Sequence, residues 1–184
     1  AAVNYLTESP QKRPLHRASK EAAQLLLSRV YLYMQDWHNA ALIAEELLKE
    51  DTRLYYMSAR DSARVFLSED NTEVLFSQGS MNFYNGMTGD RGDFAVSDSL
   101  VQLYDQENDY RRYFFGKNQS TSANSLQWKY DTIAVPHVSD IYTLRIAEGY
   151  LNLAEAYAME DNSQGANQYL RLLRESRIRT YVHT

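Results

Sequence analysis

A long helix near the C-terminus is predicted by the stretch Asp140-Ile-Tyr-Thr-Leu-Arg145-Ile-Ala-Glu148-Gly-Tyr150-Leu-Asn-Leu-Ala-Glu155-Ala-Tyr157. Ser139 or Asp140 can cap this helix, which should run from Ile141 to Ala158. Ser163 can cap a partner helix that ends near Ile178. Because the connection between them is short, we expect the two helices to be antiparallel neighbours.

A similar pair is predicted near the N-terminus. Residues from Ala18 to Met34 should form a helix, because apolar side chains recur there at three- and four-residue spacing. They fall on two faces, which predicts a helix that is sandwiched between neighbours. One face carries Ala22, Leu25, Leu26, Val30 and Tyr33, and the other carries Ala23, Leu27, Tyr31 and Met34. Asp36 is placed to cap the next helix, whose buried stripe is Ala40, Ile43, Ala44, Leu47 and Leu48.

The two pairs are related by an internal repeat. A shift of 126 positions takes Leu27 to Leu153, Ser28 to Ala154, Tyr31 to Tyr157, Ala40 to Ala166 and Leu47 to Leu173. A tetratricopeptide-type hairpin has large, small and aromatic residues at such positions. The predicted fold is therefore mostly α: a tetratricopeptide-like α-α superhelix of helix hairpins, with inserted long loops and a small β element. We expect one domain over 1–184, with helix pairs at 18–50 and 139–179 around a loop and short-strand insertion at 68–138.

The insertion between the two helical pairs lacks a long helical pattern, and its sequence predicts short elements joined by loops. Leu54–Leu67 is predicted to hold an irregular helix, and Glu73–Ser77 a short strand. A loop rich in Gly, Asn and Asp should follow from Gly79 to Phe94, and a short helix capped by Ser97 or Asp98 from Val96 to Tyr104. Gly116–Asn124 is predicted to be a mobile loop and Leu126–Val135 a second strand.

The composition excludes several classes of protein. The 184 residues include 19 basic and 24 acidic side chains, a net charge of -5, which disfavours general binding of nucleic acid. The absence of cysteine excludes disulfides, zinc–thiolate sites and iron–sulfur clusters. Four scattered histidines do not predict a metal site, and no phosphate-binding or dinucleotide-binding motif predicts a cofactor. No apolar run is long enough to span a bilayer.

The sequence resembles the SusD/RagB-like outer-membrane glycan-binding proteins of Bacteroidetes. The stretch from Asp140 to Tyr157 is similar to that family's Arg-x-Ala-Glu-x-Tyr-Leu-x-x-Ala-Glu-Ala helix. Ala18–Ala40, Glu73–Phe76 and Leu103–Arg111 are similar to other family segments in the same order. The resemblance covers roughly residues 17 to 179 and implies a fragment that lacks the family's N-terminal half.

The resemblance implies a function and a location. It implies non-enzymatic binding of an oligosaccharide or polysaccharide at the bacterial outer-membrane surface, for import through a SusC-like TonB-dependent transporter. It also implies a lipoprotein whose anchor lies outside this chain, because the family's anchoring cysteine is absent here. No cofactor and no nucleic-acid partner are expected.

The charges of the C-terminal helix pair favour structural ion pairs. We expect Arg145 to pair with Glu148 three residues on, and Glu155 to face Arg174, Arg177 and their neighbour Arg171. The alternative is an α-helical glycoside hydrolase that uses Glu148 and Glu155. Their separation of two helical turns, about 10.5 Å of rise, is marginal for such a carboxylate pair.

Binding of a glycan requires aromatic rings that stack on sugars and polar groups that bond hydroxyls. The insertion supplies candidates in Phe83, Tyr84, Asn85, Asp90 and Trp128. Burial in the core is the competing interpretation, since aromatics also serve helix packing in this chain. A further alternative is a tetratricopeptide-type protein-interaction scaffold without glycan binding, for which exposed aromatics would cluster on the first helix of each pair and not on loops.

Overall fold

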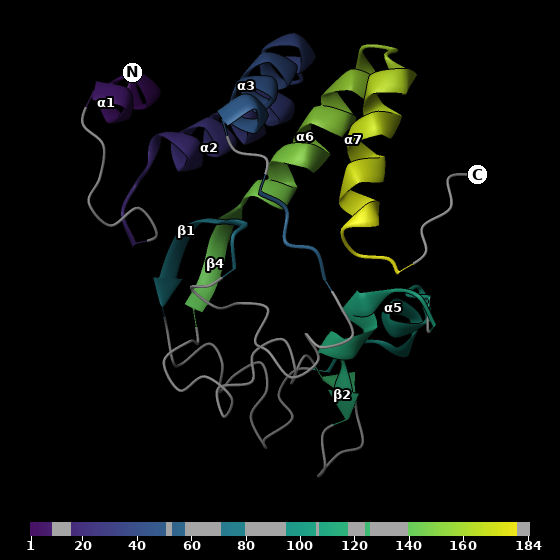
Figure 1. Cartoon of the computed structure of the whole chain (residues 1–184). Coiled ribbons are helices and arrows are strands. Elements are labelled where there is room, and N and C mark those ends of the chain that lie inside the picture. Colours follow the sequence, from purple (N-terminus) through teal and green to yellow (C-terminus); the bar gives the residue numbers. More distant parts are fainter. Residues whose placement is uncertain are drawn as a thin grey trace.

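The computed structural model describes residues 1–8, 16–50, 53–57, 71–79, 95–105, 107–117, 124–125 and 140–179. Its helices α2 (Lys20–Tyr33) and α3 (Trp37–Glu50) form the first predicted pair, and α6 (Ile146–Met159) and α7 (Ser163–Glu175) form the second. A short helix, α1 (Ala2–Glu8), lies beside α2 (Figure 1). The described part of the chain is mostly helical, as the sequence predicts.

The internal repeat extends to the turns between the helices. Gln35 and Asp161, which are 126 positions apart, both adopt a φ of 60°. The following residues cap the second helix of each pair: an Asp36 carboxylate oxygen accepts from the Asn39 amide at 3.3 Å, and the Asn162 side-chain oxygen accepts from the Gly165 amide at 3.0 Å. The cap of α7 is thus Asn162, one residue before the predicted Ser163, at the position equivalent to Asp36.

The helix α6 begins five residues later than the sequence predicts. Residues Asp140–Arg145 form the strand β4, which pairs antiparallel with β1 (Val74–Gly79). Arg145 has extended dihedrals, φ -135° and ψ 146°, and provides no side-chain cap, so neither Ser139 nor Asp140 caps α6. The prediction of a helix over 141–145 was wrong because pairing with a distant strand overrides the local helical pattern.

The insertion is partly described. Its elements are the short helix α5 (Asp98–Gln102) with Ser97 as its N-cap, the 3-10 helix η3 (Tyr110–Phe114), and the strand pair β2 (Gly116–Lys117) and β3 (Asn124–Ser125). The helix predicted over Leu54–Leu67 is wrong for Leu54–Met57, which is not helical. Residues 58–67, the loop at 80–94 and the strand predicted at 126–135 lie outside the described residues.

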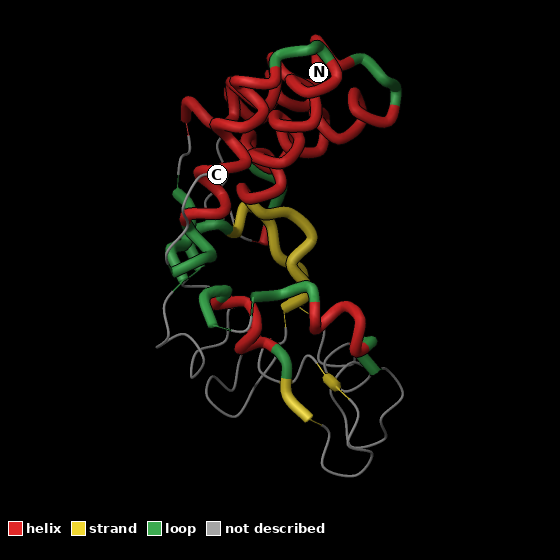
Figure 2. The backbone as a smooth tube through the Cα atoms, turned by 90° about the vertical axis from the view of Figure 1, so that its right-hand side faces the viewer, coloured by secondary structure: helices red, strands yellow, loops and turns green. Residues whose placement is uncertain are grey.

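The core lies where the two helical pairs meet. Helix α3 packs against both α2 and α6, which also contact each other, and Leu25, Leu47, Ile146 and Leu153 have no exposed surface. Gly149 allows α6 to approach α3 closely, since a Cβ there would lie 3.1 Å from Leu47 Cδ2. Figure 2 shows the helical pairs at one end of the molecule, with the β1–β4 pair next to them.

One face of α2 departs from its prediction. The sequence predicts burial on both sides of this helix, yet Leu26, Val30, Tyr33 and Met34 are 48%, 44%, 86% and 66% exposed. Burial is confined to the side that faces α3 and α6, where Leu25 and Ser28 have no exposed surface.

Candidate functional site

The predicted glycan-binding residues belong to the part of the chain that connects the end of β1 to the start of β4. Phe83, Tyr84, Asn85, Asp90 and Trp128 all lie outside the described residues. The flanking backbone is described: Gly79 at the end of β1 is the register partner of Asp140 at the start of β4. The chain therefore leaves and re-enters the scaffold at neighbouring positions, while the opposite end of the strand pair, Val74 and Arg145, adjoins α6.

Glu73, the residue before β1, contacts three other parts of the chain: Tyr55, Arg177 and the start of α6. The Glu73 side chain has no exposed surface, and Oε1 accepts hydrogen bonds from the Arg177 guanidinium and, at 2.9 Å, from the Tyr55 amide. Arg145 Nη1 lies 3.6 Å from Oε2. The Glu73 carbonyl accepts from the amide of Ile146, the first residue of α6, at 2.8 Å.

These contacts show that the predicted partners of Arg145 and Arg177, Glu148 and Glu155, were wrong. Arg145 and Arg177 both form ion pairs with Glu73, which was not among the predicted ion-pair residues. Arg145 precedes α6 in extended backbone, so the spacing of an i, i+3 helical pair does not apply to it. Arg174 lies in the last turn of α7 and is exposed, and its carbonyl accepts from the amides of Arg177 and Ile178, each at 2.9 Å.

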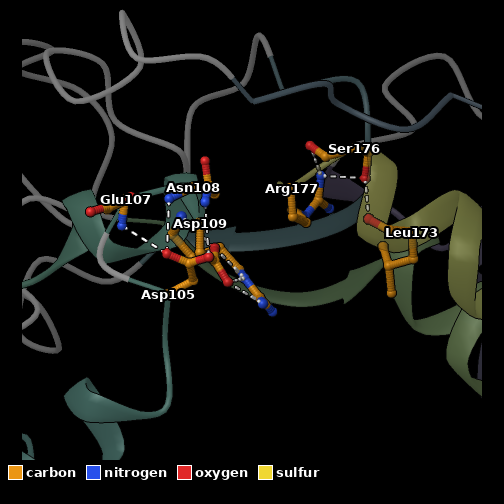
Figure 3. A network of polar contacts seen from close by, with 8 residues as sticks. Asp105, Glu107, Asn108, Asp109, Leu173, Ser176 and Arg177 are labelled. Atoms are coloured by element: carbon orange, nitrogen blue, oxygen red, sulfur yellow. Dashed lines mark hydrogen bonds and ion pairs between the residues drawn. The ribbon is translucent and has the colours of Figure 1, made fainter. Parts of the chain in front are cut away.

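The described part of the insertion is attached to the end of α7. The Tyr110 amide donates to the Arg177 carbonyl at 3.0 Å, and the Arg179 amide donates to the Asn108 carbonyl at 2.9 Å. Figure 3 shows the two sides of this junction, with Asp105, Asn108 and Asp109 on one and Ser176 and Arg177 on the other. Hydrogen bonds from the amides of Glu107 and Asn108 and from the Asn108 side chain lower the pKa of Asp105.

Aromatic rings in this part of the insertion are held by arginines. Arg111 lies over the Tyr104 ring, 5.0 Å from its centroid, and forms a two-pronged hydrogen bond to the nearly buried Asp109, with distances of 2.9 and 2.6 Å. This hydrogen bond raises the pKa of the Arg111 guanidinium. Arg112 lies 4.6 Å from the centroid of the Tyr113 ring and donates to its hydroxyl at 2.8 Å. Each of the two rings, Tyr104 and Tyr113, thus has an arginine guanidinium against it.

A second candidate site is a hollow of about 350 Å³ between α2 and α6. It is lined by Arg29, Leu32, Tyr33, Glu148, Asn152 and Glu155. Arg29 Nε and Nη2 donate to the two oxygens of Glu148 at 2.6 and 2.7 Å. Glu148 thus pairs with Arg29 of α2, and the predicted partner Arg145 was wrong. That hydrogen bond raises the pKa of the Arg29 guanidinium. Arg29 lies 119 positions from Glu148, so local spacing could not reveal it.

Glu155 also lies on the α2 side of α6. It is exposed and lines the same hollow as Arg29 and Tyr33, and no ion pair of Glu155 is found among the described residues. It shares a face with Glu148 because seven residues make about two helical turns. The predicted contact with the arginines of α7 is therefore not formed in the described structure; Arg171 pairs with Glu175 at 3.5 Å.

The described residues contain no cluster of His, Asp or Glu side chains that could hold a metal ion. Among the helices of this described part, none combines the length and hydropathy of a membrane-spanning segment.

Several solved structures have the same fold as this chain. A SusD-like carbohydrate binding protein from Bacteroides vulgatus ATCC 8482 has a TM-score of 0.74 and 24% identity, and the match covers 100% of this chain and 44% of that protein. A SusD superfamily protein from Bacteroides thetaiotaomicron VPI-5482 has a TM-score of 0.73 and 21% identity, with coverages of 95% and 45%. Another SusD superfamily protein from Bacteroides vulgatus ATCC 8482 has a TM-score of 0.75 and 21% identity, with the same coverages.

No protein-family model matches the sequence. No curated protein matches it either. The similarity is therefore seen in structure, and it spans less than half the length of each of the three solved proteins described above. The resemblance drawn from the sequence is confirmed at this level: the chain has the fold of the corresponding part of the SusD-like proteins.

Proposed function

We propose that this chain is part of a glycan-binding protein. The observation that carries the proposal is the match of the whole chain to a SusD-like carbohydrate binding protein with a TM-score of 0.74. We further propose that the protein acts at the outer-membrane surface as a lipoprotein and passes its glycan to a SusC-like TonB-dependent transporter.

The site we propose lies in the insertion, at Phe83, Tyr84, Asn85, Asp90 and Trp128. Two features of the described structure support this place. The insertion starts and ends at adjacent positions, Gly79 and Asp140, on a strand pair anchored by the buried Glu73. Within the insertion, the backbones of Asn108 and Tyr110 are further hydrogen-bonded to the chain that follows α7. A binding loop whose two ends are held in place loses less conformational entropy on ligand binding than a loop with free ends.

We propose binding without catalysis. Glycoside hydrolysis requires two carboxyl groups about 5 to 9.5 Å apart, one of which must be able to donate a proton. Both oxygens of Glu148 accept hydrogen bonds from Arg29, and Glu155 lies about 10.5 Å further along the axis of α6. The pair on α6 is thus unsuited to that chemistry.

The proposal is tested by affinity electrophoresis of the protein through gels that contain plant, host or microbial polysaccharides. Tyr84→Ala and Trp128→Ala should abolish the retardation that one of these glycans causes. Tyr33→Ala is the matched control, because it removes an aromatic ring that is 86% exposed but lies on the helical scaffold. Circular dichroism should show unchanged helix content in all three variants.

The outcomes separate the hypotheses. Retardation that survives in Tyr33→Ala and disappears in the other two variants supports a glycan site in the insertion. Retardation lost only in Tyr33→Ala would place the site between α2 and α6. No retardation by any glycan would contradict the proposal.

A protein-interaction scaffold is the second candidate function, and the hollow between α2 and α6 favours it. Its exposed aromatic, Tyr33, lies on the first helix of a pair, where tetratricopeptide-type grooves bind peptides. Under this hypothesis, Tyr33→Ala and Glu155→Gln weaken binding to a purified SusC-like transporter in surface plasmon resonance. Equal binding by both variants and the unchanged protein would contradict it.

A further inference from the structure

The hollow between α2 and α6 is lined by three charged side chains, which do not balance. Arg29 donates from Nε and Nη2 to the two oxygens of Glu148, at 2.6 and 2.7 Å, so these two residues neutralise each other. Glu155 lines the same hollow, two helical turns beyond Glu148 on α6. No ion pair of Glu155 is found within the described structure. The lining residues of the hollow thus carry one net negative charge, at Glu155.

An amide oxygen adds a second acceptor to this hollow. Asn152 lies on α6 between Glu148 and Glu155 and is 7% exposed. Its Nδ2 donates to Ser28 Oγ on α2 at 2.9 Å, which fixes the orientation of the amide. Oδ1 is then the atom of this side chain that can accept a hydrogen bond from a ligand.

The two other lining residues are an aromatic ring and an aliphatic side chain. Tyr33 is 86% exposed, and the face of a tyrosine ring attracts cations. Leu32 is partly buried and packs against the hydrophobic core, so it offers an apolar wall. The hollow therefore combines two oxygen acceptors, a ring face and an apolar surface.

This combination matches a lysine side chain, which has a compact ammonium group on an apolar stem of methylene groups. An arginine fits less well, because its planar guanidinium pairs best with both oxygens of one carboxylate. The carboxylate held in that way here, Glu148, is already occupied by Arg29. The volume of about 350 Å³ is at the lower end for ligand pockets, which suits a single side chain.

We propose that the hollow between α2 and α6 binds a lysine side chain of a partner protein. The ammonium group lies between the Glu155 carboxylate and Asn152 Oδ1, and the Tyr33 ring lies against it. The methylene stem packs on Leu32. This inference rests on the second candidate function, the protein-interaction scaffold, and names the side chain by which the partner is recognised.

A photo-reactive peptide tests the proposal, because covalent trapping detects weak binding. The short peptide carries a lysine next to a diazirine amino acid, and a matched peptide carries norleucine, which keeps the stem but lacks the ammonium group. After photolysis with the whole protein, mass spectrometry locates the labelled residues. We expect the lysine peptide to label the lining of the hollow about fivefold more than the norleucine peptide, as one ion pair at a surface can contribute.

Variants identify the groups that bind the ammonium. Glu155→Gln should reduce labelling by the lysine peptide to the level of the norleucine peptide, and Tyr33→Ala should reduce it about threefold. Glu46→Gln is the matched control, because it removes the same charge from the exposed Glu46 of α3, which does not line the hollow. It should leave the labelling unchanged, and circular dichroism should show the same helix content in all variants.

Equal labelling by the lysine and norleucine peptides, or equal labelling by an otherwise identical arginine peptide, would overturn the proposal. Its failure differs from that of the scaffold function. If Tyr33→Ala and Glu155→Gln weaken transporter binding but the lysine peptide does not label the hollow, the scaffold function stands and the lysine site is wrong. If the labelling depends on Glu155 but transporter binding is the same in all variants, the lysine site stands and the transporter is not its partner.

Discussion

Glu73, just before β1, connects four parts of the described structure. Its carboxylate is fully buried, accepts from Arg177 and from the Tyr55 amide, and lies 3.6 Å from Arg145. These contacts join the strand β1, the start of α6, the segment 53–57 and the end of α7. Oε2 has no hydrogen-bond partner within the described structure, so its nearest charge there is the Arg145 guanidinium at 3.6 Å.

Glu73→Gln should lower the free energy of unfolding by about 3 to 5 kcal/mol, because it leaves buried guanidinium charge without a carboxylate. Urea denaturation followed by circular dichroism measures this loss. Arg171→Gln is the control, since it breaks the exposed pair with Glu175 and should cost no more than about 0.5 kcal/mol. Equal losses in the two variants would contradict the role of Glu73.

Tyr157 connects three helices in a comparable way. Its hydroxyl on α6 donates to Glu45 on α3, and its ring lies 5.9 Å from that of Tyr169 on α7. Burial, together with the hydrogen bond to Glu45, raises the pKa of Tyr157 above the ordinary tyrosine value. Burial also raises the pKa of Tyr169.

A raised tyrosine pKa makes stability depend on alkaline pH. In the unfolded chain tyrosine ionises near pH 10, whereas the folded state holds the proton of Tyr157 to higher pH. The stabilisation is complete below about pH 10 and is lost as the pH rises from there toward the folded-state pKa. Between about pH 9 and 11, the urea midpoint of Tyr157→Phe should therefore fall less than that of the unchanged protein, with each compared to its own midpoint at pH 8. Parallel curves would show that Tyr157 does not carry this dependence.

At the scale of elements, the helices were predictable where their signals are local. The 3.6-residue pattern and the residue Asp36 indicate α2 and α3, and the repeat indicates α6 and α7. The strand β4 was not, because Ile141-Tyr-Thr-Leu144 extends the apolar run of α6 without a break. Its pairing with β1, more than 60 positions away, supplies backbone hydrogen bonds that no local pattern reveals.

The start of α7 depends on a glycine. A Cβ on Gly165 would lie 2.7 Å from the Tyr157 ring and 2.7 Å from the side-chain Nδ2 of Asn162. Gly165→Ala should therefore lower stability by about 1 to 2 kcal/mol, since the steric cost exceeds the roughly 1 kcal/mol gained in helix propensity. Thermal unfolding measures the change. Gln164→Ala, an exposed neighbour in the same turn, should stay within about 0.5 kcal/mol of the unchanged protein, and a stabilised Gly165→Ala would contradict the close approach.

At the scale of the whole molecule, the fold class was predictable and the ion-pair partners were not. The repeated hairpins follow from helical spacing, whereas Arg29 and Glu148 are 119 positions apart and Glu73 and Arg177 are 104 apart. Such partners become neighbours only when the two helical pairs stack. The predicted glycan-binding residues lie outside the described residues, so their place on the molecule stays a prediction.

The most direct test of glycan binding by the insertion is a fluorescence titration. The chain has two tryptophans, Trp37 at the start of α3 and Trp128 in the insertion. Trp37→Phe leaves Trp128 as the one tryptophan of these 184 residues. Titration of this 184-residue chain with the glycan selected by affinity electrophoresis should change its emission in a saturable way, as stacking on a sugar alters the surroundings of the indole. Binding that leaves the Trp128 emission unchanged would contradict a site at Trp128, and the absence of binding to every glycan would contradict the proposed function itself.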